Sequence, residues 1–118
     1  MAVIRTDNLT IPQGTTWAIR WPLLNAEGQP LDTTGWIAQA QIRSKAESQT
    51  VLHEWSTTVG NAVFVDGALE LRLEPVDSQN WESWRPAVAV YDVKLTTPDN
   101  KVSRLVRGSV TVIEQVTR

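Results

Sequence analysis

Two runs rich in β-branched residues, 87–95 and 102–113, constrain the fold of this 118-residue chain more than any other feature. Valine, isoleucine and threonine favour extended backbone, because their branched side chains suit a pleated, half-buried surface. Between the two runs, Pro98 presets φ for a turn and Asn100 tolerates a left-handed conformation. The sequence therefore predicts a C-terminal β-hairpin to which the upstream segments pair or pack.

Several upstream segments alternate apolar and polar residues with a period of two, as expected for strands with one buried and one wet face. A tight turn at Asp66 and Gly67 predicts a second hairpin between residues 61–65 and 68–73. The residues expected to face the core are Trp17, Ile19, Trp21, Trp36, Ala38, Ala40, Ile42, Leu69, Leu71 and Leu73. The residues expected to face solvent are Thr16, Ala18, Arg20, Gln39, Gln41, Arg43, Glu70, Arg72 and Glu74.

Residues 75–84 interrupt this β pattern. Pro75 suits the first position of a helix, and Val76, Trp81 and Trp84 have spacings that can share one helical face. The segment is predicted to form one or two helical turns that cross the end of the sheets.

The whole pattern predicts an all-β fold, an antiparallel two-sheet β-sandwich of seven to nine short strands spaced about ten residues apart. A partly closed barrel is the alternative. We expect an extended arm at residues 1–8, one sandwich domain at 9–114 and a short tail at 115–118. Within the domain, Pro12 predicts an edge strand at residues 9–14, and Gly108 predicts a bulge or bend in the last strand.

Composition argues against several classes of protein. The chain has no cysteine, so disulfides and thiolate metal sites are excluded. A formal charge of −2 without a concentrated basic face argues against nucleic-acid binding. No apolar run approaches the roughly 20 residues that cross a bilayer, and the first residues lack the pattern of a signal peptide. We expect no membrane association and a protein that folds in a reducing cytoplasm.

The candidate catalytic groups are sparse and scattered. His53 is the only histidine and is expected at the surface or rim of a strand. The glycines are isolated in turns, so no phosphate-binding loop is present, and no acidic run has the spacing of a calcium loop. Tyr91 is expected in the core with its hydroxyl near an edge. The sequence predicts a protein that is not an enzyme and has no metal or cofactor.

Six tryptophans accompany one phenylalanine and one tyrosine. Tryptophan is a frequent interface anchor, because it combines a large apolar surface with an N–H group that needs a partner. Each one could instead fill the core. Six in a domain of this size predict that one or two face a partner.

Four segments together resemble a phage family: residues 9–17, 28–36, 91–100 and 108–118. They are similar to immunoglobulin-like β-sandwich structural proteins of tailed phages, including the N-terminal domain of baseplate upper proteins and small tail, fibre or head accessory proteins. The resemblance implies an immunoglobulin-like sandwich with no catalytic motif. Because the chain stops at Arg118 without a coiled-coil or receptor-binding extension, a small accessory subunit is expected rather than a full baseplate adaptor.

The expected function is therefore that of a virion structural protein of a tailed bacteriophage, present in many copies and bound to other phage structural proteins. A tail, baseplate or fibre-associated subunit is preferred, and a capsid decoration protein is the alternative. A carbohydrate-binding module that stacks tryptophan on a host-surface glycan is the alternative of another class. Docking is expected through edge strands and terminal segments. The interface candidates are Val3, Ile4, Arg5, Trp21, Trp55, Val116 and Arg118.

Overall fold

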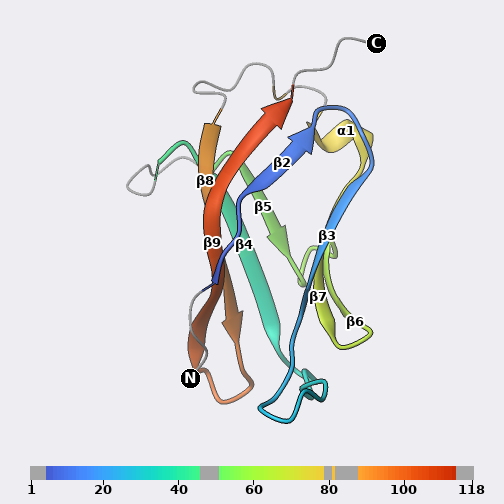
Figure 1. Cartoon of the computed structure of the whole chain (residues 1–118), viewed down its shortest axis with the longest axis vertical. Coiled ribbons are helices and arrows are strands. Elements are labelled where there is room, and N and C mark those ends of the chain that lie inside the picture. The colour runs from blue at the N-terminus through green and yellow to red at the C-terminus, as the bar shows by residue number, and fades with distance from the viewer. Residues whose placement is uncertain (1–4, 46–50, 79–80, 82–87, 114–118) are drawn as a thin grey trace.

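The computed structural model describes residues 5–45, 51–78, 81 and 88–113, which form nine strands and one short helix (Figure 1). The strands are β1 (Arg5–Thr6), β2 (Leu9–Pro12), β3 (Trp17–Pro22), β4 (Ile37–Arg43), β5 (His53–Ser56), β6 (Ala62–Val65), β7 (Ala68–Leu73), β8 (Val88–Thr96) and β9 (Val102–Ile113). The helix is α1 (Pro75–Ser78). The all-β prediction is confirmed, as is the predicted range of strand number.

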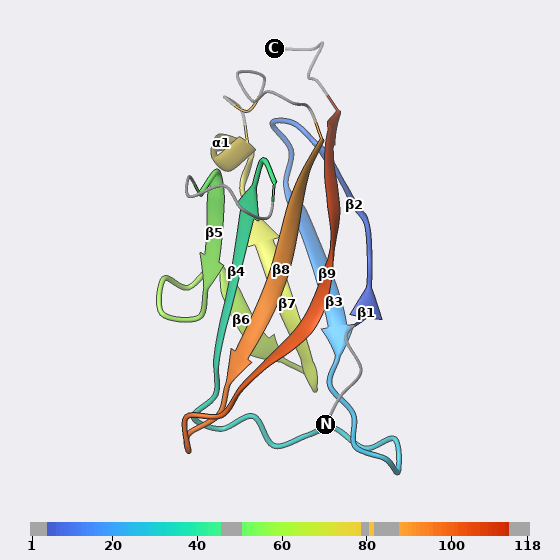
Figure 2. The same cartoon turned by 90° about the vertical axis from the view of Figure 1, so that its left-hand side faces the viewer.

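The strands form two sheets that face each other (Figures 1 and 2). The larger sheet has the order β1–β9–β8–β4–β5, with β2 also paired to β9, and the smaller sheet has the order β3–β7–β6. In immunoglobulin domains the last two strands likewise pair with a middle strand of the chain, and in the variable type further strands extend that sheet. The chain is therefore an immunoglobulin-like sandwich rather than a barrel.

The pairing of the first two strands was not predicted. β1 and β2 both run parallel to β9, whereas every other strand pair among the described residues is antiparallel. Parallel pairing is possible here because the whole domain separates the first strands from the last one in sequence.

Trp55 on β5 fills the space left by small residues on β4. It pairs with Ala40 in the antiparallel ladder, and its side chain is 0% exposed. Its indole Nε1–H donates to the backbone carbonyl of Arg72 on β7, 2.9 Å away in the opposite sheet. Burial of a large apolar side chain contributes about 1.5–3 kcal/mol. Trp55 thus joins the two sheets by apolar contact and by a hydrogen bond.

A pair of stacked aromatic rings also joins the two sheets. The rings of Trp21 on β3 and Tyr91 on β8 are stacked, with their centroids 6.4 Å apart. In antibody domains the corresponding two strands are linked by a disulfide. This chain has no cysteine, and the stacked aromatic pair joins the strands at this place.

The two predicted tight turns are confirmed. Asp66 and Gly67 have φ values of 51° and 75°, as a type I′ hairpin requires, and they join β6 to β7. Asn100, in the turn between β8 and β9, has a φ of 66°.

The turns differ in how closely other parts of the chain approach them. A Cβ atom added at Gly67 would lie 2.9 Å from the Cβ of Pro30, so this hairpin tip packs against the loop after β3. Gly28 and Gly60, by contrast, have no atom within 4 Å of such a Cβ. The turns at residues 28 and 60 therefore face open space.

The predicted helical turn is confirmed, but its apolar face was assigned wrongly. α1 has only four residues, and Val76 is 64% exposed, so Val76 does not share a buried face with Trp81. Trp81 itself is buried. Trp84 lies outside the described residues.

Gly108 does not form the predicted bulge. It pairs in register with Tyr91, and the ladder of β8 and β9 is irregular elsewhere, between Val93 and Lys94, where Leu105 is passed over. Gly108 has a different role, which involves the N-terminal strands.

Candidate functional site

The structure corrects two of the predicted interface residues. Trp21 is 2% exposed and Trp55 is 0% exposed, so both belong to the core and neither can anchor a partner. Arg5 is exposed on β1. The other candidates lie outside the described residues: Val3, Ile4, Val116 and Arg118.

Part of the segment predicted to be an extended arm belongs to the domain. Arg5 and Thr6 form β1, and the backbone N–H of Asp7 donates to the carbonyl of Arg107 at 2.9 Å. Residues 5–8 therefore belong to the larger sheet, and the boundary predicted after residue 8 does not hold for them.

Asp7 is held by polar groups from both sheets. The indole Nε1–H of Trp21 donates to its carboxylate at 2.9 Å, and the hydroxyl of Tyr91 donates to its backbone carbonyl at 2.6 Å. Burial, together with the charge of Asp7, raises the pKa of Tyr91 well above its usual range, so this hydroxyl stays a donor. The stacked pair thus points its two polar ends at one residue of the N-terminal segment.

Gly108 leaves the space that Asp7 needs. A Cβ atom at Gly108 would lie 2.1 Å from the carbonyl oxygen of Asp7, which is far inside van der Waals contact. Next to it, the backbone N–H of Ser109 donates to the side-chain oxygen of Asn8 at 3.1 Å. We call the groups of Trp21, Tyr91, Gly108 and Ser109 that hold Asp7 and Asn8 the strand clasp.

His53 is half-buried on the edge strand β5, as expected for the rim of the sheet, and its ring packs in an aromatic cluster. Its ring is 4.7 Å from that of Trp55, edge to face, and 5.4 Å from that of Trp81. Its Nε2 atom is buried without a hydrogen-bond partner among the described residues. Burial lowers the pKa of His53, although Asp77 and Glu54 oppose this effect. A neutral imidazole with no nearby nucleophile fits a packing role.

Glu70 was predicted to face solvent but is only 8% exposed. It lies on the outer face of the smaller sheet between two arginines: the Nε of Arg20 donates to it at 2.7 Å, and Arg72 donates to its other oxygen. The hydrogen bonds from Arg20 and then Arg72 lower the pKa of Glu70. Both oxygens are thus occupied by guanidinium partners, and the group is a structural ion cluster.

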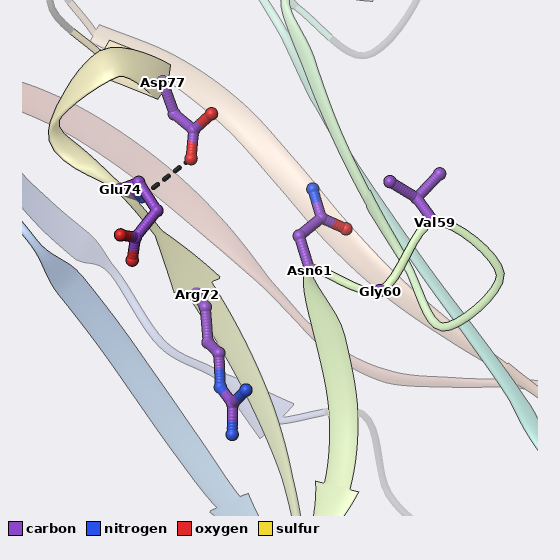
Figure 3. A pocket seen from close by; sticks show the side chains of 6 residues that line it. All are labelled: Val59, Gly60, Asn61, Arg72, Glu74 and Asp77. Atoms are coloured by element: carbon purple, nitrogen blue, oxygen red, sulfur yellow. Dashed lines mark hydrogen bonds between the residues drawn. The ribbon is translucent and has the colours of Figure 1, made fainter.

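A recess of about 400 Å³ opens beside the start of α1 (Figure 3). The residues that line it are Val59, Gly60, Asn61, Arg72, Glu74 and Asp77. Its polar groups already serve the fold: the carboxylate of Asp77 accepts from the backbone N–H of Glu74 at 2.7 Å, and the side chain of Asn61 bonds the backbone of Ser56 and Glu54. The lining contains no pair of nucleophile and base.

Within residues 5–45, 51–78, 81 and 88–113, no three His, Cys, Asp or Glu side chains come together in a way that could hold a metal ion. No helix in the same part of the chain is both long and apolar enough to cross a bilayer.

No protein-family model and no curated protein matches this sequence. Among solved structures, extracellular domains 3–5 of Drosophila OTK match at 16% identity and a TM-score of 0.44, over 93% of this chain and 33% of that one. Murine CRIg matches at 13% identity and 0.46, over 90% and 92%. The extracellular domain of the voltage-gated sodium channel β4 subunit matches at 9% and 0.41, over 98% of both chains. The chain spans a third of the OTK structure. Matches at this level say nothing about function.

Proposed function

We propose that this protein is a non-enzymatic structural subunit of a tailed-phage particle. It is associated with the tail, baseplate or fibres, is present in many copies, and binds neighbouring phage proteins through the edges of its sheets. The resemblance of four of its segments to phage sandwich proteins supports the location. The exposed edge of the smaller sheet supports the mode of binding.

The edge strand β6 is the observation that carries the binding mode. β6 is the last strand of the smaller sheet (Figure 1), and among the described residues it pairs only with β7. It has no charged residue, and its Val63, Phe64 and Val65 are half-buried. Proteins usually protect such an edge with lysine, proline or a covering loop, because it can pair with another chain. An unprotected apolar edge fits the addition of a strand from a neighbouring subunit.

The chemistry of the described residues supports the non-enzymatic part. Glu70, His53 and Tyr91 have the shifted pKa values that can mark catalytic groups, but each is engaged in packing or in a structural contact. None of them lines the recess beside α1. Shifted groups that do not converge on a cavity lack one feature that active sites usually have.

Immunogold electron microscopy of purified particles tests the location. An antibody against the chain should label the tail tip, baseplate or fibres. Label over the capsid would replace this role with capsid decoration. If neither intact nor disrupted particles carry any label, the protein is not a virion component.

A pair of substitutions in β6 tests the binding mode. Val63→Lys together with Val65→Lys places two charges on the edge and should reduce the copy number in particles, because a charged edge disfavours strand addition. Val102→Lys is the matched control, since Val102 is 60% exposed in the larger sheet. Circular dichroism should show that both variants fold. Equal incorporation of the two variants would contradict docking at β6.

A further inference from the structure

We propose that the strand clasp is an acceptor site for a second copy of this chain, and that residues 5–12 of neighbouring copies exchange. In the exchanged state, β1 and β2 of one copy pair with β9 of the next. This inference rests on the proposal that the protein assembles in many copies, and it names one contact within that assembly.

The clasp recognises a specific short sequence. The indole Nε1–H of Trp21 selects a carboxylate, the notch at Gly108 admits only a closely apposed backbone carbonyl, and the N–H of Ser109 selects a side-chain oxygen one residue later. Together these groups bind an Asp-Asn pair whose backbone runs parallel to β9. The site is thus built around a peptide segment rather than a small molecule.

The chain contains two Asp-Asn pairs, and only one of them can occupy the clasp. Asp99 and Asn100 lie in the tight turn after β8, where Asn100 has a φ of 66°, so they cannot be presented as a strand. Asp7 and Asn8 connect β1 to β2 and lie close to the N-terminus. Residues 5–12 of another copy are therefore the occupant that the clasp fits.

The segment could move from one copy to another without loss of its contacts. Among the described residues, β1 and β2 have no ladder partner other than β9: Arg5 and Thr6 pair with Val106 and Arg107, and residues 9–12 pair with residues 110–113. Leu9 and Ile11 fill the core beside Val110 and Val112, and a second copy supplies the same side chains. Exchange of an identical element is a low-cost route to association.

The connection to β3 can act as the hinge. Only residues 13–16 separate β2 from β3, and the turn centres on Gly14, which has a φ of 72°. Two side-chain hydrogen bonds hold this turn: Gly14 N–H donates to the hydroxyl of Ser78 at 2.8 Å, and the Thr15 hydroxyl donates to the Pro12 carbonyl at 2.7 Å. Because the segment is terminal and its ladder is parallel, its release costs less than opening a central strand.

Single cysteines in an otherwise cysteine-free chain test the exchange. Thr10 on β2 is exposed, and its partner in the ladder is the half-buried Thr111 on β9. One purified chain carries Thr10→Cys, and a second, of different mass through a tag, carries Thr111→Cys. After mixing and mild oxidation, a disulfide between the two chains reports that β2 of one copy lies on β9 of the other.

The expected result is a mixed disulfide that exceeds the control by ~10-fold or more, because a docked strand holds the two thiols at an effective concentration near millimolar. The control pairs Thr10→Cys with Ala18→Cys, an exposed position in the smaller sheet. A chain that carries both Thr10→Cys and Thr111→Cys should form this disulfide within one copy or between two exchanged copies, and either product verifies the register.

Two outcomes would overturn the inference. If the double variant closes on itself but the mixture gives no more cross-link than the control, the clasp binds only its own segment. If the double variant forms no disulfide, either within a copy or between copies, β2 does not pair with β9 as described, and no such acceptor exists. In both cases the particle labelling experiment is unaffected, so failure of the exchange is distinguishable from failure of the proposed function.

Discussion

The carbonyl oxygen of Asp7 occupies the space that a side chain at Gly108 would need, and this close approach lets β1 and β2 follow the edge of β9. The contact joins residues that are a hundred positions apart in the chain. A single methyl group at Gly108 should therefore affect the pairing of the whole N-terminal segment.

We predict that Gly108→Ala destabilises the protein by about 3 kcal/mol or more, at the upper end of the cost of overpacking, because the opposing atoms belong to the backbone. Urea unfolding measures the effect. Gly28→Ala is the control: its turn is open but has a φ of 80°, so it should lose only about 1–2 kcal/mol. If the two variants lose equal stability, Asp7 does not approach Gly108 as described.

The protonation state of His53 also depends on the residues that pack around it. Because burial lowers its pKa, His53 stays neutral in the folded chain at pH values where it would already bind a proton when unfolded. Its contribution to stability is complete above an unfolded-state pKa of about 6.5 and is lost as the pH falls through the window below that value.

We predict that stability falls between pH 7 and pH 5, by up to about 1.4 kcal/mol for each unit by which the pKa of His53 is lowered. His53 is the only histidine, and the lowered pKa values of Glu54 and Glu70 act at more acidic pH. His53→Phe keeps a ring between Trp55 and Trp81 but cannot titrate. Unfolding of this variant in urea should be nearly independent of pH across the same window; an unchanged pH dependence would refute the assignment to His53.

At the scale of elements, the N-terminal segment is an integral edge of the larger sheet. Residues 5–8 supply the partners of two buried polar groups, the indole Nε1–H of Trp21 and the hydroxyl of Tyr91. A buried donor that loses its partner costs about 1–3 kcal/mol.

Two truncated chains distinguish the contribution of residues 5–8 to stability from that of residues 1–4. Removal of residues 1–8 should lower the free energy of unfolding by about 2 kcal/mol or more, because two donors lose their partners. Removal of residues 1–4 keeps every contact described for residues 5–12 and should change stability by less than about 0.5 kcal/mol. Thermal and urea unfolding followed by near-UV circular dichroism gives both values. Equal stability of the two truncated chains would show that Asp7 contributes little.

Local sequence signals predicted the elements well. Asp66 and Gly67 form the β6–β7 turn because of their own backbone preferences. Ala38, Ala40 and Ile42 alternate with polar residues because one face of β4 is buried. These features depend on neighbours within a few residues. The sequence was therefore sufficient to predict the all-β class and most of the strands, but it left a barrel open as the alternative to a sandwich.

Long-range contacts could not be predicted in the same way. Nothing near Asp7 in the sequence indicates that Trp21 and Tyr91 bind it, and Glu70 is buried because Arg20, fifty residues earlier, folds over it. The abundance of tryptophan suggested interface anchors, but which face of a strand meets the other sheet is settled only by packing. The clasp was missed for this reason; the glycine within the last strand was its one visible signal.

At the scale of the whole molecule, the tryptophans act as internal supports. Of those that the structure describes, Trp21, Trp55 and Trp81 are buried, and Trp17 and Trp36 pack against the core. Sugar-binding modules need an exposed indole face, and the five described tryptophans are buried or half-buried.

We predict that a broad panel of oligosaccharides leaves the intrinsic tryptophan fluorescence unchanged, because the described indoles are buried or half-buried against the core. Quenching by acrylamide checks the shielding directly and should be weak compared with free tryptophan. A saturable spectral shift with any glycan would contradict this prediction and would favour the carbohydrate-binding alternative.

The open and crowded turns have a practical consequence. Peptide tags or fluorescent labels should be tolerated near Gly28 and Gly60, where nothing lies close to the backbone, but not near Gly67, whose tip presses on Pro30. The same contrast should govern natural variation in loop length: the turns at 28 and 60 can lengthen without disturbing the sheets, whereas the β6–β7 turn must keep its two residues.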